Sequence, residues 1–264
     1  MHQFPRMPIT DIPITNLSFS AYRLVGDGGV RLEPASFLSL VHWFEAEKFR
    51  AFARELYQEA LHSPSVKEVR RFSAGHQRHW RGDWLAVKQR ALACGMVYAA
   101  RSDPGSNRWL GTADELAHAL LPLGFEERLL AAACAEYVRL RDAQSVSFLG
   151  GAAAPPDHIG KRIHAVHKKA EGYWRLAHWI GRHGSWQIHD WAIQQHVPVS
   201  YHGAASSRLA TAQIARLAES TDHFIVFEQR KGKVMDRVIR QIKTIKASIE
   251  LDLYASDAEG ALTI

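Results

Sequence analysis

Hydrophobic positions in the first half of the chain recur mainly at helical spacing, after a short segment with strand-like alternation. Leu17, Phe19 and Ala21 alternate with serines, which is the period of a half-buried strand. The run Gly26-Asp27-Gly28-Gly29 is typical of a tight turn, so a β-hairpin is expected there. Ser63-Pro64 is expected to end one helix and cap the next. Apolar faces at helical spacing predict helices over 37–63, 83–96, 114–121 and 125–141.

From about residue 145 the pattern changes to an alternation of strands and helices. Short apolar runs predict strands at 146–149, 176–180, 197–201, 223–227 and 248–253. The helical patterns between them cover 157–169, 188–195, 209–217 and 234–245. Strands that alternate with helices in this way predict a parallel, doubly wound sheet. We therefore expect a mostly helical α+β domain over 1–143, followed by an α/β Rossmann-like domain over 144–264.

Composition adds limits on the compartment and the partners. The 264 residues suffice for two domains, and a hydrophobic share of 47% supports packed cores. No run of 18 apolar residues occurs, so we expect no membrane-spanning helix and no membrane partner. Cys94 and Cys134 lie in apolar helical contexts and are expected to be free thiols in a reducing cytoplasm. The net charge of +6 favours anionic partners such as nucleotides or nucleic acid.

Two short motifs carry the most specific chemical information. Residues 40–49 read Leu-Val-His-Trp-Phe-Glu-Ala-Glu-Lys-Phe, and residues 81–88 read Arg-Gly-Asp-Trp-Leu-Ala-Val-Lys. Together they resemble the two signature motifs of the NADAR family. Members of that family handle ADP-ribose-like compounds, and characterised ones cleave the N-glycosidic bond between ribose and a guanine or related base. The resemblance covers about residues 14–141 and implies a small sheet followed by helices.

The resemblance also indicates where catalysis is expected. The catalytic Glu of the family, directly before the His, corresponds to Val41 here. Positions 41, 45 and 48 share one face of a helix, so Glu45 lies one turn below that place. In the family the carboxylate is expected to assist expulsion of the base and to stabilise the positive ribose. Glu45, with His42, is therefore the catalytic candidate, and Glu47 is the other nearby carboxylate. The alternative is that Glu45 and Lys48 form an ordinary helix-surface pair.

The same motifs supply candidates for ligand binding. The resemblance implies that Trp84 stacks on a base or ribose, although a tryptophan at helical spacing can equally belong to the core. Lys48, Arg81 and Lys88 are candidates for binding a pyrophosphate, and the alternative is that they are solvated surface cations. The 15 histidines show no spacing typical of a zinc site, so no metal and no cofactor are expected.

Glycine-rich stretches follow three of the predicted strands in the second half. They read Gly-Gly at 150–151, Gly-Arg-His-Gly-Ser at 181–185 and Arg-Lys-Gly-Lys at 230–233. They resemble the loops of SLOG domains, a Rossmann-like group with DNA-processing and cytokinin-activating relatives and nucleotide sensors of bacterial conflict systems. Such turns let backbone N–H groups and a helix N-terminus approach a phosphate. The alternative is that they are ordinary surface turns. The candidate residues are Gly150, Gly181, Arg182, Gly184, Ser185, Lys231, Gly232 and Lys233.

These observations predict a protein that binds an ADP-ribose-type nucleotide or a nucleotide–base conjugate. In the active form of this hypothesis the first domain is an N-glycosidase, and the second domain binds a nucleotide. The alternative is a catalytically inactive nucleotide sensor or scaffold in bacterial defence or signalling. The presence of Val41 in place of the family's catalytic Glu supports this alternative. A third hypothesis is a nucleic-acid-binding protein. It is based on the positive net charge and on the SLOG resemblance. SLOG domains often self-associate, so the resemblance also implies a homo-oligomer.

Overall fold

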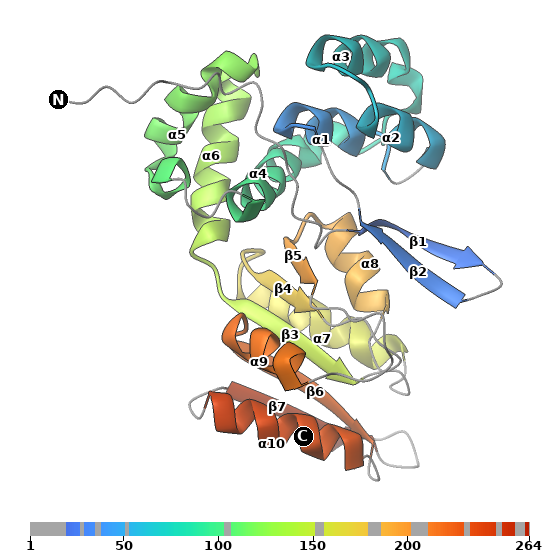
Figure 1. The fold of residues 1–264 in the computed structure, drawn as a ribbon, viewed down its shortest axis with the longest axis vertical. Coiled ribbons are helices and arrows are strands. Elements are labelled where there is room, and N and C mark those ends of the chain that lie inside the picture. Colours follow the sequence, from blue (N-terminus) through green and yellow to red (C-terminus); the bar gives the residue numbers. More distant parts are fainter. Residues whose placement is uncertain are drawn as a thin grey trace. The chain divides into compact units, whose positions relative to one another are not determined.

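A computed structural model describes the fold of most of the chain (Figure 1). The described residues are 20–26, 29–34, 38–50, 53–102, 107–150, 156–178, 186–201, 211–229, 233–246, 250–256 and 262–263. The contacts divide the chain into two compact units, Met1–Asp142 and Ala143–Ile264. In the part of the chain that the structure describes, no helix is long and apolar enough to cross a membrane.

The first unit contains one β-hairpin and a set of helices. Its strands are β1 (Ser20–Gly26) and β2 (Gly29–Pro34). Its α-helices are α1 (Leu40–Glu47), α2 (Arg54–Leu61), α3 (Val66–Gly75), α4 (Trp84–Ser102), α5 (Ala113–Leu120) and α6 (Glu127–Arg141). Short 3-10 helices are η2 (Gln77–His79), η3 (Asn107–Leu110) and η4 (Leu121–Leu123). The strands pair antiparallel with Gly26 opposite Gly29, which confirms the predicted hairpin.

Helix α1 is buried along its whole length and lies against α4. All eight of its residues are buried, including the polar His42, Glu45 and Glu47 beside five apolar residues. Trp43 donates its indole N–H to the Ala91 carbonyl on α4 at 3.0 Å and meets Tyr98 edge to face. Gly95 lies opposite, where a Cβ would approach Trp43 Nε1 to 2.7 Å and Leu40 Cδ1 to 2.8 Å. The absence of a side chain at Gly95 therefore allows the two helices to approach closely.

The beginning of α3 differs from the sequence prediction. The cap is Ser65, whose hydroxyl accepts a hydrogen bond from the Glu68 N–H at 3.2 Å. Ser63, which was expected at this position, follows the end of α2, and its carbonyl accepts a hydrogen bond from the His42 ring. The prediction was wrong because Ser63 and Ser65 flank the same proline, and both are residues that favour helix N-termini.

The second unit is a parallel sheet with helices on both faces (Figure 1). Its strands are β3 (Ser145–Gly150), β4 (Arg175–His178), β5 (Val199–Tyr201), β6 (His223–Gln229), β7 (Glu250–Ser256) and β8 (Leu262–Thr263). Its helices are α7 (Pro156–Lys169), α8 (Trp186–Gln194), α9 (Thr211–Glu219) and α10 (Lys233–Ile245). The strand order among these described residues is β5-β4-β3-β6-β7-β8, and only the β8 pairing is antiparallel. The predicted parallel sheet is confirmed.

Alternate residues of the strands form two hydrophobic cores, one on each face. Val146 and Phe148 of β3 pack in the same cluster as Ile159 and Ile163 of α7. Their neighbour Leu149 points to the other face. There it belongs to a second cluster with residues of α9 and α10, including Ile214, Leu217, Val238 and Ile242. This alternation is the period of two in a strand, and it explains why strands buried on both faces are apolar throughout.

Candidate functional site

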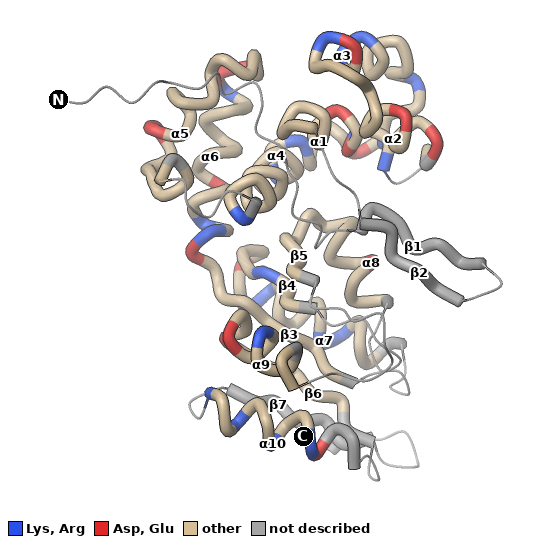
Figure 2. Tube along the Cα trace, in the orientation of Figure 1, with Lys and Arg blue, Asp and Glu red and all other residues tan. Residues whose placement is uncertain are grey.

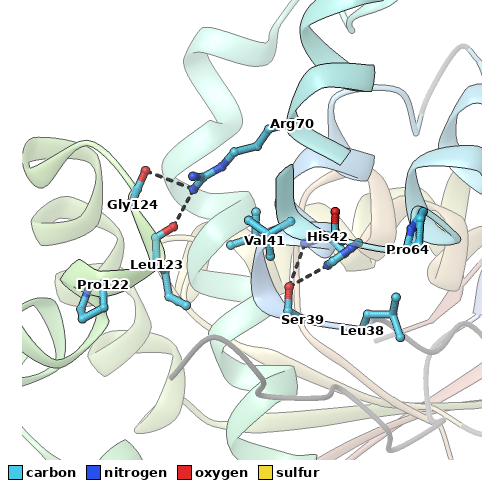
Figure 3. A pocket seen from close by; sticks show the side chains of 11 residues that line it. Leu38, Ser39, Val41, His42, Pro64, Arg70, Pro122, Leu123 and Gly124 are labelled. Carbon is cyan, nitrogen blue, oxygen red and sulfur yellow. Dashed lines mark hydrogen bonds between the residues drawn. The ribbon is translucent and has the colours of Figure 1, made fainter. Parts of the chain in front are cut away.

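The first unit contains a pocket at the beginning of α1, in the segment that carries the NADAR-like motif (Figure 3). Its volume is about 420 Å³, within the range of about 300–1,000 Å³ that is usual for small-molecule sites. None of its described lining residues is acidic. They are Leu38, Ser39, Val41, His42, Pro64, Ser65, Val66, Arg70, Pro122, Leu123 and Gly124.

His42 is held by hydrogen bonds on both ring nitrogens. Its Nε2 lies 3.1 Å from the Ser63 carbonyl, which only accepts, so Nε2 carries the proton. Its Nδ1 lies 2.7 Å from the Ser39 hydroxyl, which then donates to it. Burial lowers the pKa of His42, although the Ser63 carbonyl and the Glu45 carboxylate act in the opposite direction. The neutral ring is therefore favoured, and it fixes the chain at the pocket wall.

Arg70 joins the two walls of the pocket. Its Nη2 donates to the Leu123 carbonyl at 2.6 Å and to the Gly124 carbonyl at 3.1 Å, as the dashed lines in Figure 3 show. Gly124 has a φ of 71°, a left-handed conformation that glycine adopts without cost, and this turn exposes both carbonyls to the guanidinium. Among the described lining residues, the guanidinium of Arg70 carries the full positive charge. It also lies 6.0 Å from the Phe125 ring.

Val41 lines this pocket and is fully buried, with 0% of its surface exposed. It is the residue that corresponds to the catalytic Glu in the NADAR resemblance. An aliphatic side chain neither takes up a proton nor stabilises a positive charge. The wall that α1 contributes to the pocket therefore carries no carboxylate at this position.

Glu45 lies one turn further along α1, outside the residues that line the pocket. Its Oε2 is 2.5 Å from Lys48 Nζ, and both side chains are about nine-tenths buried. The pair is thus the (i, i+3) pair of the alternative hypothesis, but it is buried instead of exposed. The Lys48 ammonium also lies 4.4 Å from the Trp80 ring centre and within 6 Å of the rings of Phe44 and Trp84. We call Phe44, Glu45, Lys48, Trp80 and Trp84 the Lys48 cluster.

The remaining candidates of the first unit lie at or near this cluster and do not line the pocket. Trp84 is 95% buried and meets Phe44 edge to face at 5.0 Å, so it packs in the core. Arg81 is occupied by a two-pronged ion pair with Asp83, at 2.6 and 2.9 Å. Lys88 is partly buried on α4. The structure therefore brings together Glu45, Lys48 and Trp84, and it separates them from the pocket at Val41.

Sequence reasoning did not find several pocket residues. Arg70 lies 53 and 54 positions before Leu123 and Gly124, and α3 and the turn after η4 bring them together. A signal for Ser39 existed, because a serine directly before an apolar helix is typical of an N-cap. No local pattern indicated Arg70, since it lies on a helix with other cations. Figure 2 shows those cations on α3 as blue segments beside one acidic position.

In the second unit the candidates come after the ends of strands in the sequence, and these strand ends form the carboxyl edge of the parallel sheet. The chain runs from β3 outward through β4 to β5, and then returns to β6 on the other side of β3. Strands β3, β4 and β6 end at Gly150, His178 and Gln229, and the glycine-rich stretches follow these three ends. The reversal of direction between β3 and β6 is the topological switch point at which doubly wound sheets bind ligands.

Only part of that edge belongs to the described residues. Gly150 is the last residue of β3 and Lys233 is the first residue of α10. The other candidates lie outside the described residues, namely Gly181, Arg182, Gly184, Ser185, Lys231 and Gly232.

Comparisons add no assignment to this geometry. Comparison of the chain with known protein families and with curated proteins gave no match. Within the described part of the chain, no three His, Cys, Asp or Glu side chains converge to hold a metal ion.

Proposed function

We propose that the first unit binds an ADP-ribose-type nucleotide in the pocket at α1 and does not cleave its N-glycosidic bond. The observation that carries this proposal is the position of Val41. It lines the pocket at the place where the resembling family has its catalytic carboxylate. The nearest predicted replacement, Glu45, is bound to Lys48 in the interior. Among its described lining residues the pocket thus offers a binding surface without a carboxylate that could stabilise the positive ribose.

The lining of the pocket suits such a ligand. The guanidinium of Arg70 has further N–H groups besides the Nη2 that contacts the two carbonyls, and guanidinium groups bind phosphate oxygens well. The side chains of Leu38 and Val66, which are at least partly exposed, supply apolar contacts for a base or ribose. We infer a sensor or scaffold in which ligand binding, and not turnover, is the output.

The binding proposal is tested by titrating the whole protein with ADP-ribose in a calorimeter. We expect saturable binding that weakens at least about tenfold in Arg70→Gln, because a charge-assisted hydrogen bond is removed. Arg71→Gln is the matched control, since Arg71 is exposed on the same helix and does not line the pocket. Absence of ADP-ribose binding in the wild type, or equal binding by the two variants, would contradict the proposal.

The absence of turnover is tested with ADP-ribosylated guanosine, by following guanine release in a mass spectrometer. We expect no release by the wild type and measurable release by Val41→Glu, which restores a carboxylate at the pocket. Val41→Gln is the control, because it has the same size without the charge, and thermal unfolding checks that both variants fold. Guanine release by the wild type would instead show an active glycosidase, and Glu45→Gln would then be the next variant.

A second candidate function belongs to the second unit. The return of the chain at the β3–β6 switch point favours nucleotide binding at the carboxyl edge of the sheet. If ADP-ribose binds there, Lys233→Gln weakens binding, whereas Arg70→Gln and the exposed control Lys243→Gln leave it unchanged. A calorimetric titration of the three variants thus distinguishes the two sites.

A further inference from the structure

A positively charged surface runs along α3 and η2 in the first unit. Residues 66–79 contain four Lys or Arg side chains and one acidic side chain. Figure 2 shows cations of α3 as blue segments, and Lys67 and Arg71 among them are exposed. The neighbouring helix α2 instead exposes Glu55 and Glu59. The positive charge is therefore local to α3 and η2.

Lys67 and Arg71 are the cations that this surface offers to a ligand. They are four positions apart, so they share one face of α3 and are separated by about 6 Å along its axis. In the part of the chain that the structure describes, neither side chain makes a hydrogen bond or an ion pair. The one acid of the segment, Glu68, is held at the start of the helix, where the Ser65 hydroxyl donates to its carboxylate at 3.1 Å. Both positive charges are thus available to an anion.

Three aromatic rings follow one another from α3 into η2, next to Arg71. The ring centre of His76 lies 4.4 Å from that of Phe72, with 36° between the ring planes. The ring centre of His79 lies 6.4 Å from that of His76, with 38° between the planes. Phe72 and His76 are partly exposed, and His79 is exposed. The series therefore begins at the core and ends at the surface.

Hydrogen bonds orient the two imidazole rings. His76 Nδ1 donates to the Phe72 carbonyl at 2.9 Å. Arg78 Nε donates to His79 Nε2 at 3.0 Å, so this nitrogen carries no proton. Both bonds are made in the plane of the ring, which leaves the ring faces for stacking. Arg78 thus positions the His79 ring, whereas Lys67 and Arg71 supply the charge for a ligand.

Unpartnered cations beside exposed rings are the combination that binds single-stranded nucleic acid. The cations attract the phosphates, and the rings stack on the bases, which all have a flat face. A duplex keeps its bases stacked inside, and a phosphopeptide or a lipid surface has no base. The exposed His79 ring therefore favours a single strand over these other anionic partners.

We propose that α3 and η2 form a binding surface for single-stranded DNA or RNA. Lys67 and Arg71 contact phosphates of the strand, and His79 stacks on an unpaired base, with His76 behind it. This function goes beyond nucleotide binding in the pocket at α1, because neither of the two cations lines that pocket.

The test is fluorescence anisotropy of the whole chain with labelled oligonucleotides of about 12 nucleotides, a length within the usual site sizes. Oligo-dT and oligo-rU are compared with a blunt duplex of the same length at about 50 mM salt. A duplex has the higher charge density, so a surface that acts by charge alone would bind it at least as tightly. We expect the single strands to bind at least about tenfold tighter. No binding of either single strand, or equal binding of the duplex, overturns the proposal.

The two cations are tested together in the double variant Lys67→Gln with Arg71→Gln. Loss of two phosphate contacts should weaken single-strand binding at least about tenfold. The slope of log affinity against log salt should become shallower by about 1.4, at about 0.7 for each contact. The control Lys161→Gln with Lys168→Gln removes the same charge from exposed positions of α7 and should bind within about twofold of the wild type. Equal weakening by the two double variants overturns the proposal.

The ring is tested by His79→Ala and His79→Phe. His79→Ala should weaken single-strand binding at least about fivefold, because stacking on one base is lost. His79→Phe keeps a flat ring and should bind within about twofold of the wild type. His118→Ala, at an exposed position of α5, is the control for the loss of an imidazole. Unchanged binding by His79→Ala overturns the proposal, since a polyanion without bases, such as dextran sulfate, would then be an equal ligand.

The variants separate this surface from the pocket. All substituted side chains are exposed, and thermal unfolding followed by circular dichroism checks that each variant folds. ADP-ribose binding by Lys67→Gln with Arg71→Gln should equal that of the wild type, because both residues lie outside the pocket lining. Failure of ADP-ribose binding and failure of nucleic-acid binding are therefore independent results.

Discussion

Individual charged residues have an unusual place in the first unit. Glu45, Glu47, Lys48 and Arg50 are all buried at the end of α1. They form two (i, i+3) ion pairs, Glu45 with Lys48 and Glu47 with Arg50. Aromatic rings surround the cations, with Arg50 4.8 Å from the Trp43 ring centre and Lys48 4.4 Å from that of Trp80. A buried pair adds little net stability, but loss of one partner is costly because the other charge remains in the core.

The Glu47–Arg50 pair provides a prediction at this scale. Glu47→Ala should lower the free energy of unfolding by about 3–5 kcal/mol, because Arg50 is left buried without its carboxylate. Burial opposes the charged form of Arg50, whereas Glu47 and Tyr57 raise its pKa, so the guanidinium stays charged. Urea unfolding measures the change. The control Glu59→Ala, at an exposed position, should alter the free energy of unfolding by less than about 0.5 kcal/mol.

The double variant Glu47→Leu with Arg50→Met should recover most of the lost stability. A double variant that is no more stable than Glu47→Ala contradicts the argument.

His42 makes the stability of the first unit depend on pH. Burial lowers the pKa of His42 in the folded chain, whereas the unfolded value is about 6.5. Between these two values the unfolded chain binds more protons, so stability is complete above about pH 6.5 and is lost as the pH falls. His42→Gln should reduce this slope, which is at most about 1.4 kcal/mol per pH unit for one group.

Urea unfolding between pH 5 and pH 8 checks that slope. The exposed His118→Gln is the control for the loss of one imidazole. Equal slopes in the wild type and His42→Gln would show that His42 does not contribute to the pH dependence.

At the scale of elements, the site depends on how closely α1 lies against α4. Trp43 is fixed by its hydrogen bond to Ala91, so its ring has little freedom to move away from Gly95. Ser39 caps α1 and also contacts the His42 ring, which couples the start of the helix to the pocket. A change at the contact between the helices therefore moves the segment that forms the pocket wall.

Gly95→Ala tests that contact. An alanine usually favours a helix by about 1 kcal/mol over glycine. Here its methyl group would meet Trp43 and Leu40 at less than 3 Å, and overpacking costs about 1–3 kcal/mol. Because Trp43 is held, we expect a net loss of stability and weaker ADP-ribose binding. Gly75→Ala is the control, since a Cβ there meets nothing within 4 Å, and it should be neutral or stabilising. Equal thermal midpoints for the two variants would contradict this expectation.

At the scale of the whole molecule, each of the two compact units has a core of its own. Unit Ala143–Ile264 contains both clusters that cover the sheet. The residues of the first pocket belong to Met1–Asp142.

Separate expression tests the independence of the second unit. Residues 143–264 should fold alone and unfold in one cooperative transition in circular dichroism, because their core lies within the unit. A fragment of residues 151–264 is the control. It lacks β3, which pairs with both β4 and β6, so the sheet is divided and the transition should be lost. A fragment 143–264 without cooperative unfolding would show that the first unit is required.

The sequence predicted the elements better than the site. Helix ranges such as 114–121 and 125–141 correspond closely to α5 and α6, since apolar spacing reports a face that must be buried. The range 37–63 was less clear, because α1 buries its polar residues together with its apolar ones, so no exposed polar face marks where it ends. The resemblance to NADAR and SLOG proteins, and the division into domains of those families, stay predictions. The catalytic and binding roles of the candidate residues stay predictions too.

Local pattern was sufficient wherever one segment determines its own conformation. Short-range pattern predicts the alternating strands and helices after residue 145 and the hairpin at Gly26–Gly29. It also predicts that the motif at residues 40–49 begins a helix. Tertiary structure alone decided that Arg70 faces Leu123 and Gly124, and that the Glu45–Lys48 pair is buried instead of exposed. The physical reason is that burial depends on neighbours far along the chain, which no local spacing records.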